Sequence, residues 1–345
     1  MPLLNPTILT DFVCRVLQAA GSKESSARLV AESLVKSNLA GHDSHGVVRV
    51  RQYLDTIAAG DLDPTAEPVI AHEAAAVSMV DAQYGYGQIA ANYAITIAID
   101  KAKTYGLAAT GLFNSNHVGR LGDWVQLAAE RGLIGLAFCN GGRPGGLVAP
   151  YGGAGRLLGT NPVAAAIPVA GRPPVIIDFA TSIAPEGKVR LALNKQEALP
   201  AGWILDADGQ PSTNPADLYA GGMLLPMAQH KGYGLSLLVE FLGGILTGQG
   251  CPALPNYATL RNGVLFMVLA LDAFGAVDEF LEESSAFCEQ VISTPPAPGF
   301  ADVMLPGDPE RRMAARRQAE GIPIDETTWS QLIQAARDLG VTVPE

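Results

Sequence analysis

The chain has 345 residues, of which 48% are apolar and 17% charged, and its formal net charge is −11. This length suggests two domains, and the composition is typical of a compact α/β enzyme rather than of a disordered or fibrous protein. The acidic balance argues against a nucleic-acid partner, because phosphate binding needs clustered Lys and Arg and the basic cluster 311–317 is short. The substrate can still be an anion.

The four cysteines are far apart in the sequence and none has CxxC spacing, so neither a disulfide framework nor a zinc knuckle is expected. The N-terminus lacks a basic stretch followed by an apolar run. No apolar run reaches the roughly 20 residues that a membrane-spanning helix requires. We therefore expect a cytoplasmic protein with no membrane partner.

The first sixty residues predict three helices, at 7–20, 22–40 and 47–57, because apolar residues recur there at helical spacing and a glycine follows each stretch. Between the second and third helices lie His42, Ser44, His45 and Arg49. On a helix beginning near Ser44, His45 and Arg49 would share one face, which would place a proton donor beside a group that binds carboxylates. The alternative is that these histidines only decorate a junction between helices.

A strand predicted at 77–81 precedes Gly85, Gly87 and Ala90 and a helix that runs to about residue 105. This order imitates the dinucleotide-binding fingerprint, in which glycines let the backbone approach a pyrophosphate at a helix N-terminus. A Rossmann unit would continue with a buried strand ending in an acidic residue. The next predicted strand, 108–113, ends instead in Asn-Ser-Asn-His. We therefore interpret the glycines as a tight turn with close helix packing.

The middle of the chain alternates strands with glycine-rich loops. We predict a helix at 123–131 and strands at 134–139, 163–168 and 174–179. The loop 140–146 could form an anion or cofactor cradle, or it could be an irregular loop. The strand-end segment 178–182 could bind ribose hydroxyls and phosphate oxygens, or it could cap the following helix.

The C-terminal part predicts a surface excursion at 194–219 and then a long apolar helix, 235–247, opened by His230–Gly234. A Lys and exposed amides at a helix N-terminus would make an anion site. A strand at 263–272 and helices at 277–290, 310–320 and 327–339 complete the prediction.

Taken together, these motifs resemble the malate/L-lactate dehydrogenase family of NAD(P)-dependent oxidoreductases. That family includes type 2 malate/lactate, sulfolactate, ureidoglycolate and diketogulonate dehydrogenases and Δ1-piperideine-2-carboxylate reductase. The motifs that carry the resemblance span nearly the whole chain: Asp43–Val47 with Arg49, Asn114–Gly119, Gly159–Pro162, Asp178–Ser182 with Gly187–Lys188, His230–Gly234 and Pro306–Gly307. Details at 149–153, 119–122 and 194–195 look most similar to the hydroxycarboxylate dehydrogenase branch.

The resemblance implies a sulfolactate dehydrogenase-like α/β fold that is not a Rossmann fold, with a mixed sheet and helical N-terminal and C-terminal parts. It implies an NAD(P)-binding domain at 115–274, a helical substrate and dimerisation part at 1–114 plus 275–345, and a homodimer. It implies NAD or NADP contacts at His117, Asn161, Asp178, Phe179, Ala180, Thr181, Ser182, His230, Lys231, Gly232, Pro306, Gly307 and Asp308. Two departures are the residues 227–229, where relatives often carry glycine, and Asp308, which replaces a frequent Glu.

The expected reaction is the interconversion of a 2-hydroxy acid and a 2-oxo acid by hydride transfer. His45 and His117 can both titrate near neutrality, and different family members use one or the other for proton transfer, so both are candidates. Arg49 offers a planar fork for a carboxylate, and Ser44 could hold a substrate oxygen.

Three other activities have to be considered. The first is reduction of a cyclic imino acid on the same scaffold. The second is a metal hydrolase with histidine ligands, although no HExxH spacing or Cys pair is present. The third is a serine hydrolase, but Ser44 lacks the flanking glycines of a nucleophile elbow. A non-catalytic binding protein would be expected to have lost His117 or the segment near Asp178, and both are present.

Overall fold

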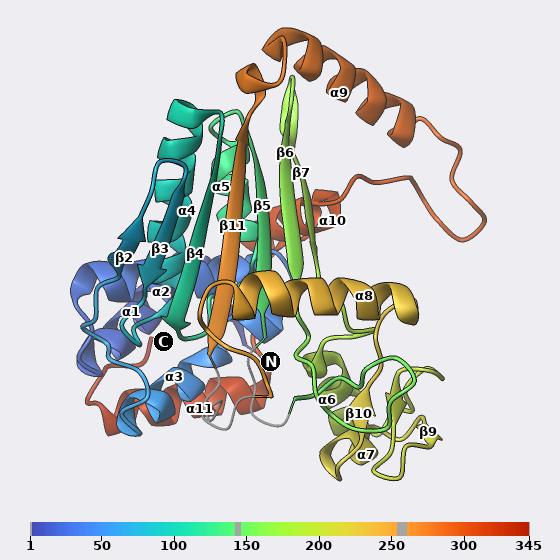
Figure 1. Ribbon diagram of the computed structural model, residues 1–345. Helices are drawn as coiled ribbons and strands as arrows, with labels where there is room; N and C mark the ends of the chain where they lie inside the picture. Colours follow the sequence, from blue (N-terminus) through green and yellow to red (C-terminus); the bar gives the residue numbers. More distant parts are fainter. Residues whose placement is uncertain (1, 142–145, 254–260, 345) are drawn as a thin grey trace.

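A computed structural model describes residues 2–141, 146–253 and 261–344 (Figure 1). The longer helices are α1 (Pro6–Ala19), α2 (Glu24–Leu39), α3 (Arg49–Ala58), α4 (Gly87–Tyr105), α5 (Gly122–Ala129), α6 (Glu186–Lys195), α7 (Pro215–Tyr219), α8 (His230–Val239), α9 (Val277–Ile292), α10 (Asp308–Glu320) and α11 (Glu326–Asp338). Three short helical segments are η1 (Asp43–His45), the π-helical η2 (Glu240–Ile245) and η3 (Leu271–Ala273). The strands are β1 (Leu3–Leu4), β2 (Val69–Glu73), β3 (Val77–Asp81), β4 (Leu107–Ser115), β5 (Leu133–Asn140), β6 (Val163–Val169), β7 (Arg172–Phe179), β8 (Ile204–Leu205), β9 (Pro211–Ser212), β10 (Met223–Leu224), β11 (Asn262–Ala270) and β12 (Ile322–Pro323).

The centre of the protein is a seven-stranded sheet with the order β2-β3-β4-β11-β5-β6-β7. Only β3 and β4 run parallel among these neighbours, and the other pairs are antiparallel. A Rossmann domain needs consecutive parallel strands connected by helices. The prediction of a mixed-sheet α/β fold that is not a Rossmann fold is therefore confirmed.

Helices α4 and α5 cover one face of the sheet, and α8 crosses the other face (Figure 1). The inner side of α4 is built largely of alanines, and the fully buried Ala94 and Ala98 are typical. Their small side chains let the helix lie close to the sheet residues Leu112 and Phe266, which belong to the same core. A second core lies among α1, α2, α3 and α11, where Phe12 and Leu34 are fully buried.

Several parts of the chain differ from the sequence prediction, and α6 is one element that the prediction lacked. Strand β2 was not predicted, since all five of its residues are exposed and show no alternation of burial. The excursion at 194–219 is in fact part of a small unit with the three-stranded sheet β10-β8-β9. Its own core includes Ile204, Leu218 and Leu224. Strands of two residues are too short to leave a periodic signal in the sequence.

The glycine turn before α4 is a site of close packing, as predicted. A Cβ atom added at Gly87 would lie 2.2 Å from the carbonyl oxygen of Asn116 and 2.4 Å from that of His117. The first residue of α4 therefore touches the backbone of the loop that follows β4. Glycine is required there because any side chain would displace that loop.

We expect Gly87→Ala to lower the free energy of unfolding by about 1 to 3 kcal/mol, the usual cost of overpacking. It should also reduce activity, because the loop that carries His117 must move. Urea unfolding and steady-state kinetics would test both effects. Gly275→Ala is the matched control, since a Cβ there meets nothing within 4 Å. Equal stability of the two variants would contradict the packing argument.

The division into domains at 1–114 plus 275–345 and 115–274 stays a prediction. The sheet takes strands from both sides of the boundary after residue 114, since β2 and β3 precede it and β5 to β7 follow it. Within the described residues, no helix is both long and apolar enough to span a membrane.

Candidate active site

His45 and His117 lie together although 72 positions separate them in the sequence. The Nδ1 atom of His45 is 3.0 Å from the Nε2 atom of His117, and the two ring planes are only 3° apart. His45 ends η1, and His117 belongs to the loop that leaves β4. The structure therefore joins the two histidines that the sequence named as alternatives.

Two further side chains extend this pair. The Oη atom of Tyr53 is 2.8 Å from Nδ1 of His117, and Nε2 of Gln88 lies 2.6 Å from Oη of Tyr53. Gln88 is fully buried and Tyr53 is nearly so. Four side chains thus form one hydrogen-bonded chain that runs from the interior to His45.

Asn38 at the end of α2 shapes the turn that carries His45. Its Oδ1 accepts from the Val47 backbone N–H over 2.8 Å, and its Nδ2 donates to Asp43 over 2.7 Å. A Cβ at Gly46 would lie 2.2 Å from this Oδ1, so glycine is required where the turn passes the Asn38 side chain. Arg317 of α10 holds the other side of Asp43 with hydrogen bonds of 2.7 and 3.1 Å.

The His117 loop is held by the asparagines before it. Asn116 Nδ2 donates to the carbonyl oxygens of Tyr84 and Gly85 over 2.7 and 3.2 Å, and Asn114 Nδ2 donates to Asp81 over 3.0 Å. Asn114 has φ 52°, a conformation that asparagine tolerates better than most residues. These asparagines position the loop by bonding within the protein.

The site favours neutral histidines in the free protein. Burial, followed by the positive charge of Arg49, lowers the pKa of His45 to about 3. The same two causes, in the same order, hold the pKa of His117 well below its usual range. Burial raises the pKa of Tyr53, so its hydroxyl stays protonated. The free site therefore presents imidazole bases rather than imidazolium acids.

Arg49 and Ser44 lie beside the pair. Arg49 Nε donates to the Ser44 carbonyl oxygen over 2.6 Å, and Arg49 Nη1 donates to Gln52 over 2.7 Å. A Cβ at Gly187 would be 3.1 Å from the Cβ of Ser44, so the start of α6 packs on this turn. The preceding residue, Glu186, is ionised: burial alone would raise its pKa, but hydrogen bonds from Arg190 and Tyr219 keep it lowered.

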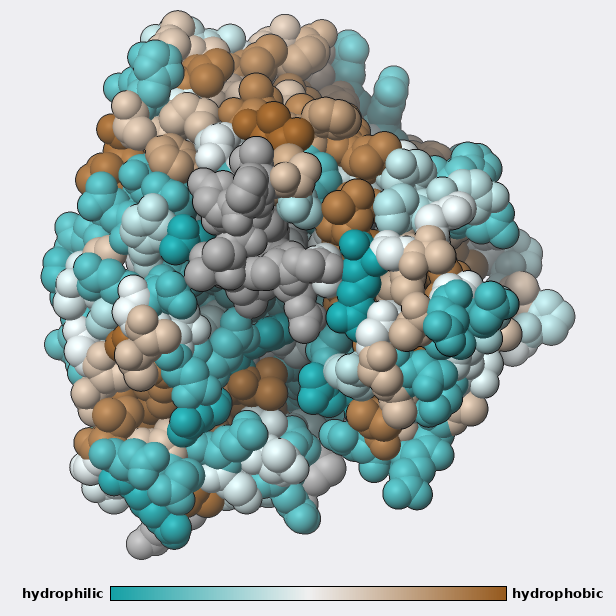
Figure 2. All heavy atoms as spheres, turned by 60° about the horizontal axis from the view of Figure 1, so that its bottom comes forward, coloured by the Kyte–Doolittle hydropathy of each residue, from teal (hydrophilic) through white to brown (hydrophobic). Residues whose placement is uncertain are grey.

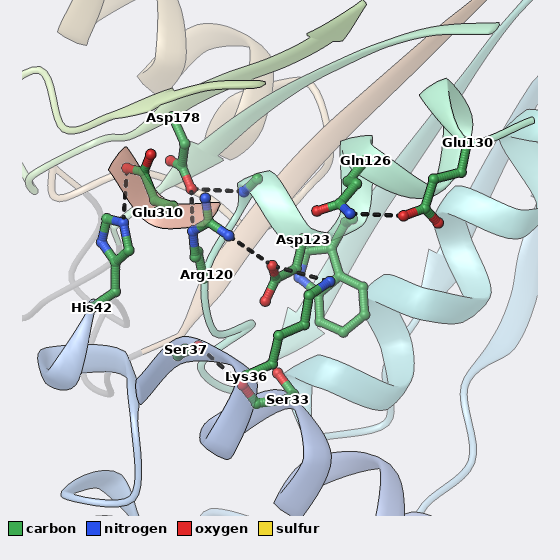
Figure 3. Close-up of polar contacts among 12 residues, drawn as sticks. Ser33, Lys36, Ser37, His42, Arg120, Asp123, Gln126, Glu130, Asp178 and Glu310 are labelled. Carbon is green, nitrogen blue, oxygen red and sulfur yellow. Dashed lines mark hydrogen bonds and ion pairs between the residues drawn. The ribbon is translucent and has the colours of Figure 1, made fainter. Parts of the chain in front are cut away.

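Figure 3 shows a charged cluster just beyond His117, formed by Lys36, Arg120, Asp123 and Asp178. Arg120 donates to Asp123 over 3.0 Å, and Lys36 lies 3.3 Å from the same carboxylate. Asp178 Oδ2 accepts from the Gly122 backbone N–H over 2.7 Å and lies 3.8 Å from Arg120 Nε. Two cations thus balance two carboxylates, and the cluster ties α2, α5 and β7 to the loop.

His42 lies apart from the pair. Its Nε2 is 3.3 Å from Glu310 of α10, and Figure 3 shows the two side chains facing each other. The contact lowers the pKa of Glu310 to about 2. His42 therefore connects the N-terminal helices to α10.

The segments named for cofactor binding gather at the ends of β6 and β7. Thr181 N–H and Oγ1–H both donate to the Thr160 carbonyl oxygen, and the Met227 N–H donates to the Thr181 carbonyl oxygen. Ser182 pairs with Pro226 in an isolated bridge. Segments 160–161, 178–182 and 226–232, which are remote in sequence, therefore adjoin one another. Phe179 is exposed there, and Ala180 lies between it and Thr181.

Asn161 is fully buried and its amide is used within the protein. Its Oδ1 accepts from the Gly141 N–H over 3.0 Å, and its Nδ2 donates to Glu240 over 2.8 Å and to Ser236 Oγ over 3.1 Å. Glu240, at the start of η2, also accepts from Asn140 over 2.6 Å. These contacts make Asn161 a support for the strand ends, and a direct cofactor contact stays a prediction. Residues 142–145 of the glycine-rich loop lie outside the described residues.

The N-terminus of α8 carries exposed His230 and Lys231, followed by buried Gly232. A Cβ at Gly232 would lie 2.1 Å from the carbonyl oxygen of Met227, so the chain doubles back tightly here. Gln229, the residue before the helix, has φ 58° and ψ −122°, a conformation that normally needs glycine. Gln229 belongs to the segment 227–229, where the sequence departs from the pattern of the family that it resembles.

We expect Gln229→Gly to raise the free energy of unfolding by about 1 kcal/mol. The relieved strain, about 1 to 3 kcal/mol, outweighs the extra entropy that glycine gives the unfolded chain. Urea unfolding would measure the gain. Gln126→Gly, in the middle of α5, should instead lose about 1 kcal/mol. A loss of stability in both variants would show that Gln229 is not strained.

The segment 306–308 lies at the start of α10 and contacts the edge of β7. The Ile176 N–H donates to the Pro306 carbonyl oxygen over 3.0 Å, and Gly307 has φ 96°. Asp308 accepts from the Leu305 N–H over 2.9 Å and from Arg311 over 2.6 Å. These residues lie next to β7, the strand that contains Asp178, and contact with a cofactor stays a prediction for them.

Sequence reasoning missed Tyr53, Gln88, Asn38 and Glu240. Tyr53 follows Arg49 by four residues on α3, so helical spacing from Arg49 could have reached it. The expected single helix from Ser44 is wrong, because His45 ends η1 and α3 begins at Arg49. Gln88 directly follows Gly87, and the test for a dinucleotide fingerprint considers only the small residues of that segment. Nothing in the sequence near Asn38 or Glu240 marks them as buried partners of distant loops.

The fold and the paired histidines can now be compared with known proteins. The model of the malate/L-lactate dehydrogenase family matches residues 4–333. Hydroxycarboxylate dehydrogenase B of Escherichia coli O157:H7 is 36% identical over 340 residues, which are 96% of this chain and 93% of the relative. A Δ1-pyrroline-2-carboxylate/Δ1-piperideine-2-carboxylate reductase of Pseudomonas syringae pv. tomato is 34% identical over 95% and 94% of the two chains.

Among solved structures, the sulfolactate dehydrogenase of Methanocaldococcus jannaschii superposes with a TM-score of 0.90 at 31% identity, over 99% of this chain and 98% of that one. A mixed α/β fold with this match defines an oxidoreductase scaffold. The chain belongs to the malate/L-lactate dehydrogenase family.

Proposed function

We propose that the protein is an NAD(P)-dependent dehydrogenase that interconverts a 2-hydroxy acid and a 2-oxo acid, with His45 as the proton-transfer residue. The observation that carries the proposal is the hydrogen-bonded His45–His117 pair beside Arg49. Both ring nitrogens of His117 face protein partners, Tyr53 and His45. Among the described residues, no hydrogen bond engages Nε2 of His45, so this nitrogen would meet the substrate.

The arrangement suits oxidation of a hydroxyl group. A neutral His45 takes the hydroxyl proton on Nε2. The hydride, with its electron pair, leaves the carbon that bears the hydroxyl group. The bound nicotinamide would accept that hydride. Arg49 would hold the substrate carboxylate, and its charge would then no longer oppose a proton on His45. The pKa of His45 would move back toward its ordinary value when the anion binds, which also suits the reverse reaction.

The exposed N-terminus of α8 suits the phosphates of NAD or NADP. The helix dipole attracts anions there, and Lys231 adds a positive charge. The adjoining segment Asp178–Ser182 supplies a carboxylate and hydroxyls of the kind that bind ribose. We assign these groups to the cofactor as part of the proposal.

The test is a screen of NADH and NADPH oxidation against pyruvate, oxaloacetate, hydroxyphenylpyruvate and a cyclic imino acid. We expect turnover of at least one 2-oxo acid with one of the two cofactors. Turnover of the imino acid alone would favour the second candidate, a cyclic imino acid reductase, which the relative from Pseudomonas syringae supports. If none of the four compounds reacts, the proposal fails.

A metal hydrolase does not suit the geometry. Within the described part of the chain, no three His, Cys, Asp or Glu side chains gather as a metal site would require. His45 and His117 instead turn ring nitrogens toward each other. Such a hydrogen bond would have to break before both rings could bind one ion.

We also propose a homodimer in the cytoplasm. Apolar side chains are exposed along the outer side of α8 and η2: Leu238, Phe241, Ile245 and Leu246. Figure 2 shows apolar atoms gathered over the upper part of the face it presents. Exposed apolar patches of this kind are typical of protein interfaces. Sedimentation velocity should give a mass near twice 36.0 kDa, and a monomer at micromolar concentration would contradict the dimer.

A further inference from the structure

The hydrogen-bonded chain behind His45 ends at Gln88, which the proposed reaction does not use directly. Gln88 has no exposed surface, and its Oε1 atom is buried without a hydrogen-bond partner. Its Nε2 meets Tyr53 Oη, which meets His117 Nδ1, whose other nitrogen meets His45 Nδ1. Buried polar groups are normally satisfied, so an orphaned amide oxygen at the end of such a chain requires an explanation.

The direction of one hydrogen bond sets the direction of the next, because each contact joins one donor and one acceptor. If Gln88 donates to Tyr53, the Tyr53 hydroxyl donates to His117 Nδ1. His117 then carries its hydrogen on Nε2 and donates to His45 Nδ1. Neutral His45 must carry its hydrogen on Nε2, where the substrate would bind, so it has no lone pair to accept a proton there.

A half-turn of the Gln88 carboxamide exchanges its oxygen and nitrogen with almost no change of shape. Oε1 then accepts from Tyr53, and the Tyr53 oxygen accepts from Nδ1–H of His117. Nε2 of His117 becomes an acceptor for Nδ1–H of His45. Nε2 of His45 is left with a lone pair directed to the substrate. The carboxamide oxygen gains Tyr53 as a partner, and the amide nitrogen takes the position that Oε1 held.

Only the second direction accommodates the transferred proton. When His45 takes a proton on Nε2 it carries hydrogens on both nitrogens, and its Nδ1–H needs an acceptor. His117 offers one only if its own hydrogen is on Nδ1, which in turn requires Tyr53 to accept. The hydrogen of Tyr53 must then go to Gln88, and an amide nitrogen cannot take it.

We infer that Gln88 is a positioning residue whose carboxamide oxygen accepts from Tyr53 and thereby sets the tautomer of both histidines. This inference rests on the proposed function for its purpose, although the tautomers can be measured without any substrate. The hydroxyl O–H bond breaks, the proton forms a bond to His45 Nε2, and the hydride carries its electron pair to the cofactor. Gln88 itself gains and loses no proton.

The charges around the pair explain why a neutral acceptor is placed at the end of the chain. Arg49 faces both histidines, Arg120 and His42 also act on His45, and Arg49 and Tyr86 act on Tyr53. Arg49 and Arg120 are positive and His42 can become positive, whereas Tyr86 is a neutral phenol. A carboxylate in place of the Gln88 amide would favour a proton on the pair and so weaken the base.

The experiment measures histidine tautomers by ¹⁵N NMR on the full-length, ligand-free protein at neutral pH. The chain has only five histidines, so single substitutions can assign the resonances. In the wild type we expect His117 to carry its hydrogen on Nδ1. In Gln88→Met the Tyr53 hydroxyl loses its acceptor and turns to His117, so the hydrogen should move to Nε2. Gln88→Glu should restore the Nδ1–H form.

Tyr86→Phe is the matched control, because it removes a buried phenol hydroxyl that contacts Ser22 and is not part of the hydrogen-bonded chain from Gln88 to His45. It should leave the tautomer of His117 unchanged. An Nε2–H form of His117 in the wild type would overturn the inference, and so would an unchanged tautomer in Gln88→Met. If Gln88→Met does not fold, the tautomer of His117 in the wild-type and Gln88→Glu spectra still tests the inference.

Kinetics give a second readout. Gln88→Met should lose at least about tenfold in kcat, because a wrong tautomer behind a catalytic histidine can cost up to about 10,000-fold. Gln88→Glu should move the pH dependence of kcat/KM for reduction to higher pH by about one unit or more, since a nearby carboxylate favours the protonated pair. An unchanged profile would overturn the inference. If the wild type shows the expected tautomer but turns over none of the tested acids, the proposed function is rejected and the inference about Gln88 still holds.

Discussion

Replacing His45 with alanine should lower kcat by about 100- to 10,000-fold, the usual contribution of a positioned general acid or base. The ring nitrogen that would meet the substrate is lost, while His117 keeps its contact with Tyr53. KM should change little, because Arg49, in its proposed role, would still bind the carboxylate. Steady-state kinetics in both directions would measure the effect, and added imidazole should restore part of the activity.

His117→Ala should also reduce kcat, by less than His45→Ala, because it removes the partner that shares the proton and leaves the first acceptor in place. His72→Ala, on the exposed strand β2, is the control and should be close to the wild type. A loss below about tenfold in both His45→Ala and His117→Ala would reject histidine acid-base catalysis at this site.

The second large effect is expected for Arg49→Met, which should raise KM by about 30- to 5,000-fold. Removing one partner of a buried charge pair costs about 2 to 5 kcal/mol, and 1.4 kcal/mol corresponds to a factor of ten. If Arg49 holds the carboxylate equally in the substrate complex and the transition state, kcat should fall much less than kcat/KM. Arg49→Lys keeps the charge but not the planar fork, so it should recover only part of the affinity.

Arg51→Met is the control for this experiment. Arg51 lies on the same helix and pairs with Asp55 on the solvent side over 2.8 Å, so it shares the charge but not the site. Arg49 also supports its own turn through Ser44. Thermal unfolding of both variants would separate a general loss of stability from a loss of binding. Equal KM values for the two variants would contradict the assigned role of Arg49.

The sequence predicted much of the fold because long periodic elements carry their own signal. The central strands and α4 emerged from runs of apolar residues, and the rejection of a Rossmann unit followed from Asn114–His117, where an acidic residue was required. Strand β2 and the small sheet β10-β8-β9 were missed, because they are exposed or very short. Local pattern cannot reveal elements that depend on their neighbours for stability.

The sequence predicted several residues of the candidate site but not the contacts between them. His45, His117 and Arg49 stand in recognisable motifs, but a contact across 72 residues depends on how the sheet and helices pack. The roles of Tyr53 and Gln88 depend on the same packing, since an interior amide and phenol look unremarkable in a sequence. The cofactor contacts proposed at 178–182, 230–232 and 306–308 still need a measurement.

The position of β11 in the sheet has a consequence for how the protein is made. This late strand pairs with β4 on one side and β5 on the other, and its first residue, Asn262, accepts from the Val118 N–H and donates to the Asn140 carbonyl oxygen. A chain that has left the ribosome only as far as β7 would leave β4 and β5 with unpaired edges, which favour aggregation. The sheet, and with it the His117 loop, can be completed only after residue 270 has left the ribosome.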